Sequence, residues 1–181
     1  MDPADKQALL TLARETIAAQ LGGRALPELP ALASEPAELG GVFVTLHNER
    51  RLRGCIGRFN PDGGLAETVQ AMAVATLGDP RFRHSPVASP ELPELRIEVS
   101  VLSKMRRTTD PASLEPGVHG VYIRRGGHSG CFLPQVATEL GWDRETFLSR
   151  CCADKAGLPP DAWKYPDTEV HLFTSEAFEE K

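Results

Sequence analysis

The sequence lacks the features that mark secreted, membrane-bound and nucleic-acid-binding proteins. Its first residues include acids and lack the basic start and apolar run of a secretory signal, and no apolar run reaches membrane length. We therefore expect a cytoplasmic protein without a membrane partner. The formal net charge at pH 7 is -5, whereas nucleic-acid-binding surfaces are rich in basic residues, so no nucleic acid is expected as a partner. One local cluster of arginines is more typical of a solvated strand edge than of a phosphate site; it comprises Arg50, Arg51, Arg53 and Arg58.

Local motifs for metals and cofactors are also missing. The four cysteines form no C-x-x-C pair and the five histidines are scattered, so local spacing predicts no metal site, although one assembled from distant residues stays open. No glycine-rich phosphate loop, Walker motif or dinucleotide-binding fingerprint is present. We expect no cofactor to be held by this chain. In a cytoplasmic protein the cysteines should be reduced thiols; they are Cys55, Cys131, Cys151 and Cys152.

The chain does contain a hexapeptide, Leu52-Arg53-Gly54-Cys55-Ile56-Gly57, that places a thiol between glycines and near an arginine. On a strand, residues two apart share a face, so Arg53 and Cys55 would project to the same side. A neighbouring guanidinium favours the nucleophilic thiolate. Gly54 and Gly57 would let a ligand or another backbone approach closely, and with Arg53 they are the candidate substrate-binding residues. The alternative is that Cys55 is a small apolar core residue, because free cysteine is among the most buried residue types.

Two further residues are candidates for proton transfer. Residues 95–102 alternate as a strand with Glu98 in its middle, where the carboxylate would face either solvent or a cleft in which it acts as a general base. His119 is predicted to point inward, either as a hydrogen-bonded core residue or as the proton acceptor for Cys55. Whether either lies near the thiol is not encoded in local sequence.

A proline corner, Asp79-Pro80-Arg81-Phe82, follows the second predicted helix. Pro80 fixes the backbone, and the Asp79 carboxylate could accept hydrogen bonds from the following amides or pair with Arg81. We interpret this segment as a structural corner.

The hydrophobic periodicity predicts an α+β fold with a mostly antiparallel sheet flanked by helices. We expect one domain over residues 1–181, built of two lobes with a cleft between them. The Arg53 and Cys55 face should line this cleft. The first expected helix ends at Leu21, and the others span 64–77, 133–141 and 143–155. The expected strands span 42–46, 52–56, 95–102, 117–124, 129–133 and 170–173.

Several blocks in a fixed order resemble the AMMECR-type domain family, in particular its members called protein A of the AmmeMemoRadiSam system. The resemblance covers nearly the whole chain and implies a two-lobed α+β fold and a functional link to a radical-SAM protein and a Memo-type protein. The resemblance does not imply a particular catalytic reaction. The blocks are the hexapeptide, the proline corner, Gly41-Val42-Phe43-Val44-Thr45-Leu46, Ile97-Glu98-Val99-Ser100-Val101-Leu102, Gly117-Val118-His119-Gly120-Val121 and Leu133-Pro134-Gln135-Val136-Ala137.

Two classes of function remain. In the first, the protein is a small enzyme that uses Cys55 as a nucleophile on an electrophilic small molecule, Arg53 holds an anionic group, and His119 or Glu98 moves protons. In the second, it is a non-catalytic binding or adaptor module that works with radical-SAM and Memo-type partners or a nucleic acid.

Overall fold

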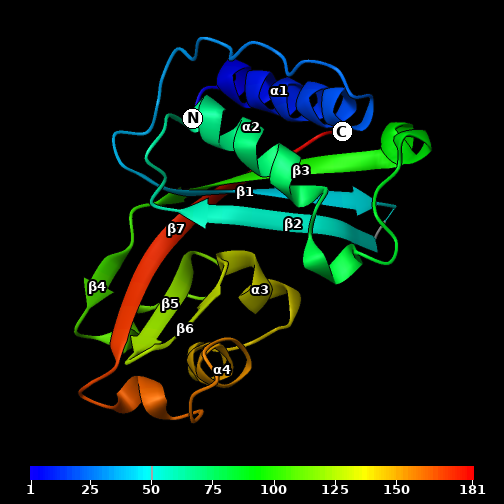
Figure 1. The fold of residues 1–181 in the computed structure, drawn as a ribbon. Coiled ribbons are helices and arrows are strands. Elements are labelled where there is room, and N and C mark those ends of the chain that lie inside the picture. Colours follow the sequence, from blue (N-terminus) through cyan, green and yellow to red (C-terminus); the bar gives the residue numbers. More distant parts are fainter. Residues whose placement is uncertain (50) are drawn as a thin grey trace. The chain divides into compact units, whose positions relative to one another are not determined.

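A computed structural model describes residues 1–49 and 51–181; Arg50, part of the arginine cluster, lies outside the described residues. The chain divides into two compact units (Figure 1). The first unit combines Met1–Leu102 with Glu176–Lys181, and the second is Ser103–Ser175. In the described part of the chain, no helix has the length and apolar character needed to cross a bilayer.

The first unit begins with helix α1, Pro3–Leu21. The Asp2 side chain accepts a hydrogen bond from the Ala4 amide at 2.8 Å, and Pro3 occupies the first turn, where its missing N–H costs nothing. The helix ends at Gly22, followed by Gly23 with a positive φ of 62°. Helix α2, Leu65–Thr76, packs beside α1, and Figure 1 shows both helices on one face of the strands.

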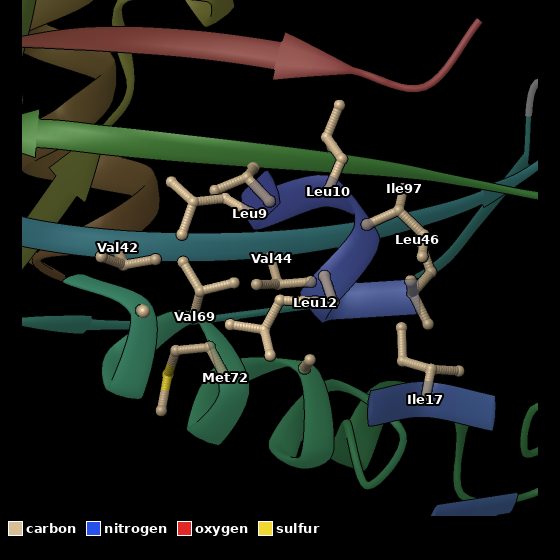
Figure 2. Packing of buried hydrophobic residues seen from close by; sticks show 14 of the residues in the cluster. Leu9, Leu10, Leu12, Ile17, Val42, Val44, Leu46, Val69, Met72 and Ile97 are labelled. Atoms are coloured by element: carbon tan, nitrogen blue, oxygen red, sulfur yellow. The ribbon is translucent and has the colours of Figure 1, made fainter. Parts of the chain in front are cut away.

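The strands of this unit are β1 (Leu39–Asn48), β2 (Arg51–Phe59), β3 (Leu95–Ser103) and the end of β7 (Glu169–Glu179), in the order β2-β1-β3-β7. One face of the strands forms the core with the two helices, and burying each large aliphatic side chain there contributes roughly 1.5 to 3 kcal/mol. Figure 2 shows this packing, which includes Leu9, Ile17, Val42, Val44, Leu46, Val69, Met72 and Ile97. Residues that alternate with them, such as Thr45 between Val44 and Leu46, therefore belong to the opposite face.

The second unit is built around β5 (His119–Arg125), which pairs antiparallel with β6 (His128–Phe132) and with β7. A short strand β4 (Arg106–Thr108) also pairs antiparallel with β7. Helices α3 (Pro134–Glu139) and α4 (Arg144–Arg150) follow, and a π-helical turn, Cys151–Lys155, extends α4. The core of this unit is separate from that of the first; it includes Leu114, Val121, Ile123, Phe132, Phe147, Leu148, Cys151, Cys152 and Val170.

The α+β fold with a mostly antiparallel sheet flanked by helices is confirmed. Strand β4 was not predicted, because Arg106-Arg107-Thr108 is polar and too short to alternate. The last strand runs to Glu179, well beyond the predicted Phe173, since its final residues are largely polar and give no apolar pattern. The single-domain organisation and the cleft between lobes stay predictions.

Candidate functional site

Cys55 lies in the middle of β2, directly opposite Thr45 of β1. Residues that oppose each other in an antiparallel pair share a face. Because Thr45 alternates with core residues, Cys55 lies on the face of the strands that does not contact α1 and α2. The Thr45 hydroxyl oxygen lies 3.2 Å from the Cys55 Sγ and donates a hydrogen bond to it. Cys55 is half-buried, so the thiol is neither sealed in the core nor fully open to solvent.

The proline corner holds the main chain of Cys55 at both of its polar groups. The Cys55 amide donates to Asp79 Oδ2 at 2.9 Å, and Arg81 Nη2 donates to the Cys55 carbonyl oxygen at 3.0 Å. Both interactions expected within the corner are also present: the Arg81 amide donates to Asp79 Oδ1 at 3.0 Å, and the Arg81 guanidinium forms an ion pair with Asp79 at 2.6 Å. No local pattern in the sequence indicates that this corner binds the cysteine strand.

Asp79 is the electrostatic centre of this arrangement. Its side chain is 1% exposed, whereas that of Arg81 is 57% exposed. Hydrogen bonds from the Arg81 side chain, and more weakly from the Cys55 and Arg81 amides, outweigh the effect of burial and lower the pKa of Asp79 to about 2. The carboxylate is therefore ionised at neutral pH and holds the Cys55 amide through a charge-assisted hydrogen bond.

Within residues 1–49 and 51–181, Arg81 is the cation whose side chain hydrogen-bonds to Cys55. The pKa of its guanidinium is raised, mainly by Asp79 and to a smaller extent by Cys55. Since Arg81 is still largely exposed, its guanidinium combines a fixed position with access to solvent. The hexapeptide alone predicts Arg53 as the neighbouring cation.

Arg53 is bound elsewhere. Leu46 pairs with Gly54 but His47 pairs with Leu52, so Arg53 is an extra residue at a β-bulge, where the two-residue alternation is interrupted. Its Nε and Nη2 atoms donate to the two carboxylate oxygens of Glu91 at 2.9 and 3.0 Å. This pairing lowers the pKa of Glu91. The role of Arg53 as a substrate-binding residue stays a prediction.

The two glycines of the hexapeptide allow close packing. A Cβ atom on Gly54 would lie 2.6 Å from the carbonyl oxygen of Thr76, at the end of α2, so here the glycine admits another backbone. A Cβ atom on Gly57 would lie 2.3 Å from the ring of Phe43. Both glycines thus have a packing reason, and their predicted contact with a substrate remains untested.

Glu98 lies on the same face of the first unit's strands as Cys55. It alternates with the core residues Ile97 and Val99 and accepts a hydrogen bond from Ser100 Oγ at 3.2 Å. Strand β1 separates β2 from β3, so the two backbones lie roughly 10 Å apart. A molecule bound over β1, rather than a direct hydrogen bond, would link Glu98 to the thiol.

His119 belongs to the second unit, at the start of β5. It is half-buried, and its Nδ1 accepts a hydrogen bond from the Glu115 amide at 3.1 Å. The proton of the neutral imidazole is therefore on Nε2. Its role as proton acceptor for Cys55 stays a prediction. Over residues 1–49 and 51–181, no group of three or more His, Cys, Asp or Glu side chains is placed to hold a metal ion.

The fold and the site define an α+β domain in which a glycine-flanked cysteine strand is fixed by an Asp-Pro-Arg corner. The AMMECR1 family profile matches residues 10–178, and the chain belongs to this family. It is similar to Protein MK0488 of Methanopyrus kandleri, with 45% identity over 96% of this chain and 87% of that protein. Protein TK0174 of Thermococcus kodakarensis is 44% identical over 96% of this chain and 89% of its own length.

The fold has a counterpart among solved structures. The crystal structure of the uncharacterized protein PH0010 from Pyrococcus horikoshii superposes with a TM-score of 0.89 at 39% sequence identity. The match covers 100% of this chain and 94% of that one. These comparisons establish the family and the fold.

Proposed function

We propose that this protein is a small cytoplasmic enzyme that uses Cys55 as a nucleophile on an electrophilic, acyl-type small molecule. One observation carries the proposal: the Cys55 sulfur accepts a hydrogen bond from Thr45 while Asp79 and Arg81 bind the main chain of the same residue. Hydroxyl donors and guanidinium groups stabilise negative charge on sulfur, and a fixed main chain holds the nucleophile in one position. A cysteine that serves only as apolar packing does not need a hydroxyl donor at its sulfur.

The reaction would proceed through a thioester. The sulfur attacks the acyl carbon, the bond between carbon and leaving group breaks, and the thiol proton passes to the leaving group. Water then attacks the thioester, which releases a carboxylic acid and restores the thiol. The exposed guanidinium of Arg81 is suited to an anionic part of the substrate. Glu98, on the same face of the first unit's strands, is the proposed proton carrier.

Replacement of Cys55 by serine tests the proposal. Cys55→Ser changes one atom and should unfold at nearly the wild-type temperature, because the site already offers polar partners, while activity should be lost. p-Nitrophenyl acetate serves as the acyl probe, with intact-mass detection of an acetyl adduct and optical detection of p-nitrophenolate. The wild type and the control variant Cys131→Ser should form the adduct and release the phenolate, whereas Cys55→Ser should do neither.

A second readout compares the metabolites of cells carrying wild-type protein or Cys55→Ser. The enzyme proposal requires at least one metabolite to accumulate in the variant. If the variant is stable, leaves all metabolites unchanged and still binds the radical-SAM and Memo-type proteins that the family resemblance implies as partners, the adaptor function replaces the enzyme.

A further inference from the structure

The second unit contains a pocket of about 330 Å³ that plays no part in the proposed function. It lies where β4, the segment after it, the turn before β7 and the start of β7 meet. All of its lining residues belong to one compact unit. They include Arg107, Thr108, Trp163, Lys164, Tyr165 and Thr168.

The charge of this pocket is positive, although the whole chain has a formal net charge of -5. Arg107 and Lys164 line it, and no Asp or Glu is among the described residues that do. A pocket of about 390 Å³ in the first unit contains Arg14 paired with Glu180 at 2.6 Å, so its charges compensate each other. The cations that line the second-unit pocket have no such carboxylate among its described lining residues. A bound oxyanion would supply the negative charge that compensates them.

Aromatic side chains form the apolar part of the pocket, and each is held by a polar contact at its edge. Trp163 Nε1 donates to Ser149 Oγ at 3.1 Å, and Tyr165 Oη donates to Asp161 Oδ1 at 2.9 Å. Because these rings are fixed before any ligand arrives, an apolar group can bind against them with little loss of side-chain entropy.

One residue that lines the pocket has a buried hydroxyl without a partner in the described part of the chain. Thr168 lines the pocket and is 8% exposed, and its Oγ1 has no hydrogen-bond partner within residues 1–49 and 51–181. An unsatisfied buried hydroxyl is costly, and most such groups in proteins are paired.

We propose that this pocket binds a small oxyanion, a phosphate or a carboxylate, that carries an attached apolar group. The oxyanion interacts with Arg107 and Lys164, and the apolar group packs on Trp163 and Tyr165. The site is separate from Cys55 and does not depend on the proposed enzymatic reaction.

The test is a titration of the full-length protein followed by NMR, with phenyl phosphate and benzoate as probes and inorganic phosphate as the reference ligand. The indole N–H signal of Trp163 should shift, while that of Trp142, which is not among the pocket residues, should stay in place. Phenyl phosphate or benzoate should bind more tightly than inorganic phosphate, and the tighter of the two identifies the oxyanion.

Removal of the charges completes the test. The double variant Arg107→Gln and Lys164→Gln should weaken binding of the better probe about tenfold or more, because two charge-assisted contacts are lost. The control variant Arg58→Gln and Arg96→Gln changes the net charge equally at exposed sites of the first unit and should bind as the wild type does. An unmoved Trp163 signal, equal binding of inorganic phosphate, or unchanged binding by the pocket variant would overturn the proposal.

Discussion

Cys55 of the first unit and Cys151 of the second are both free thiols, but their surroundings differ. Cys55 is half-buried and has Thr45 at its sulfur. Cys151 is 0% exposed, and burial raises the pKa of its thiol. Burial also raises the pKa of Cys152, and that of Cys131 to about 12. Taking a sulfur out of water disfavours the thiolate, so the second unit keeps its cysteines protonated.

The difference follows from where each cysteine falls in its element. Cys151 and Cys152 lie four residues after Phe147 and Leu148, and all four side chains are in the second core, as the helical spacing predicts. Cys55 alternates with core residues along a strand and so lies on the other face. Position on an element, rather than neighbouring residues in the sequence, therefore decides whether Cys55, Cys151 and Cys152 lie in a core.

The largest expected effect is on alkylation. With limiting iodoacetamide at neutral pH, Cys55 should react faster than Cys131, because burial raises the pKa of the Cys131 thiol to about 12 and leaves almost none of it ionised. Cys151 and Cys152 should be slower still, since they react only after the core opens. Peptide mapping by mass spectrometry measures all four rates, and the same mapping in denaturant is the control in which the rates should converge. If a second-unit cysteine were labelled before Cys55 in the native protein, the predicted order of reactivity would be wrong.

A second prediction concerns Gly54. Gly54→Ala should lower the free energy of unfolding by about 3 kcal/mol, because the new Cβ would meet a backbone oxygen of α2 that has little freedom to move. It should also change the alkylation rate of Cys55 while the second-unit cysteines stay protected. Urea denaturation measures the free energy of unfolding, and peptide mapping by mass spectrometry measures the alkylation rate of Cys55.

Gly127→Ala provides the matched control, because a Cβ atom there would meet nothing within 4 Å. Its effect on stability should stay within about 0.5 kcal/mol. Equal stability of the two variants would show that β2 does not depend on close contact with α2.

The third prediction uses pH. The folded-state pKa of Asp79, about 2, is below the ordinary value of 3.8, so the ionised carboxylate stabilises the fold above about pH 4 and this contribution is lost as pH falls towards 2. Asp79→Asn should therefore cost about 2 kcal/mol at pH 7 and progressively less below pH 4. Urea midpoints of both proteins across this range measure the difference.

The control for Asp79 makes the same chemical change at an exposed turn of the second unit. Asp110 accepts a hydrogen bond from the Ala112 amide at 3.0 Å, which asparagine can also accept. Asp110→Asn should follow the wild-type pH dependence. A penalty for Asp79→Asn that is equal at pH 7 and pH 3 would mean that shape, rather than charge, holds the corner.

The elements of the fold could be predicted because their signals are local. Helix α1 follows from Asp2, Pro3 and an apolar stripe, and β3 from strict alternation. The site was predicted only in part. The sequence identified Cys55, but the bulge at Arg53 depends on how β1 and β2 pair, which no local pattern records. Likewise, nothing near Asp79 or Arg81 indicates that both bind a residue on a strand far earlier in the chain.

The hydrogen bonds described for Cys55 have one more consequence, which concerns the order of assembly. They come from Thr45, Asp79 and Arg81, all on a single continuous stretch of chain within the first unit. The loops that must close are short, so the entropic cost of forming these contacts is modest and contact order is low. During synthesis this stretch leaves the ribosome before any residue of the second unit. The surroundings of the thiol can therefore begin to form while the rest of the chain is still being made.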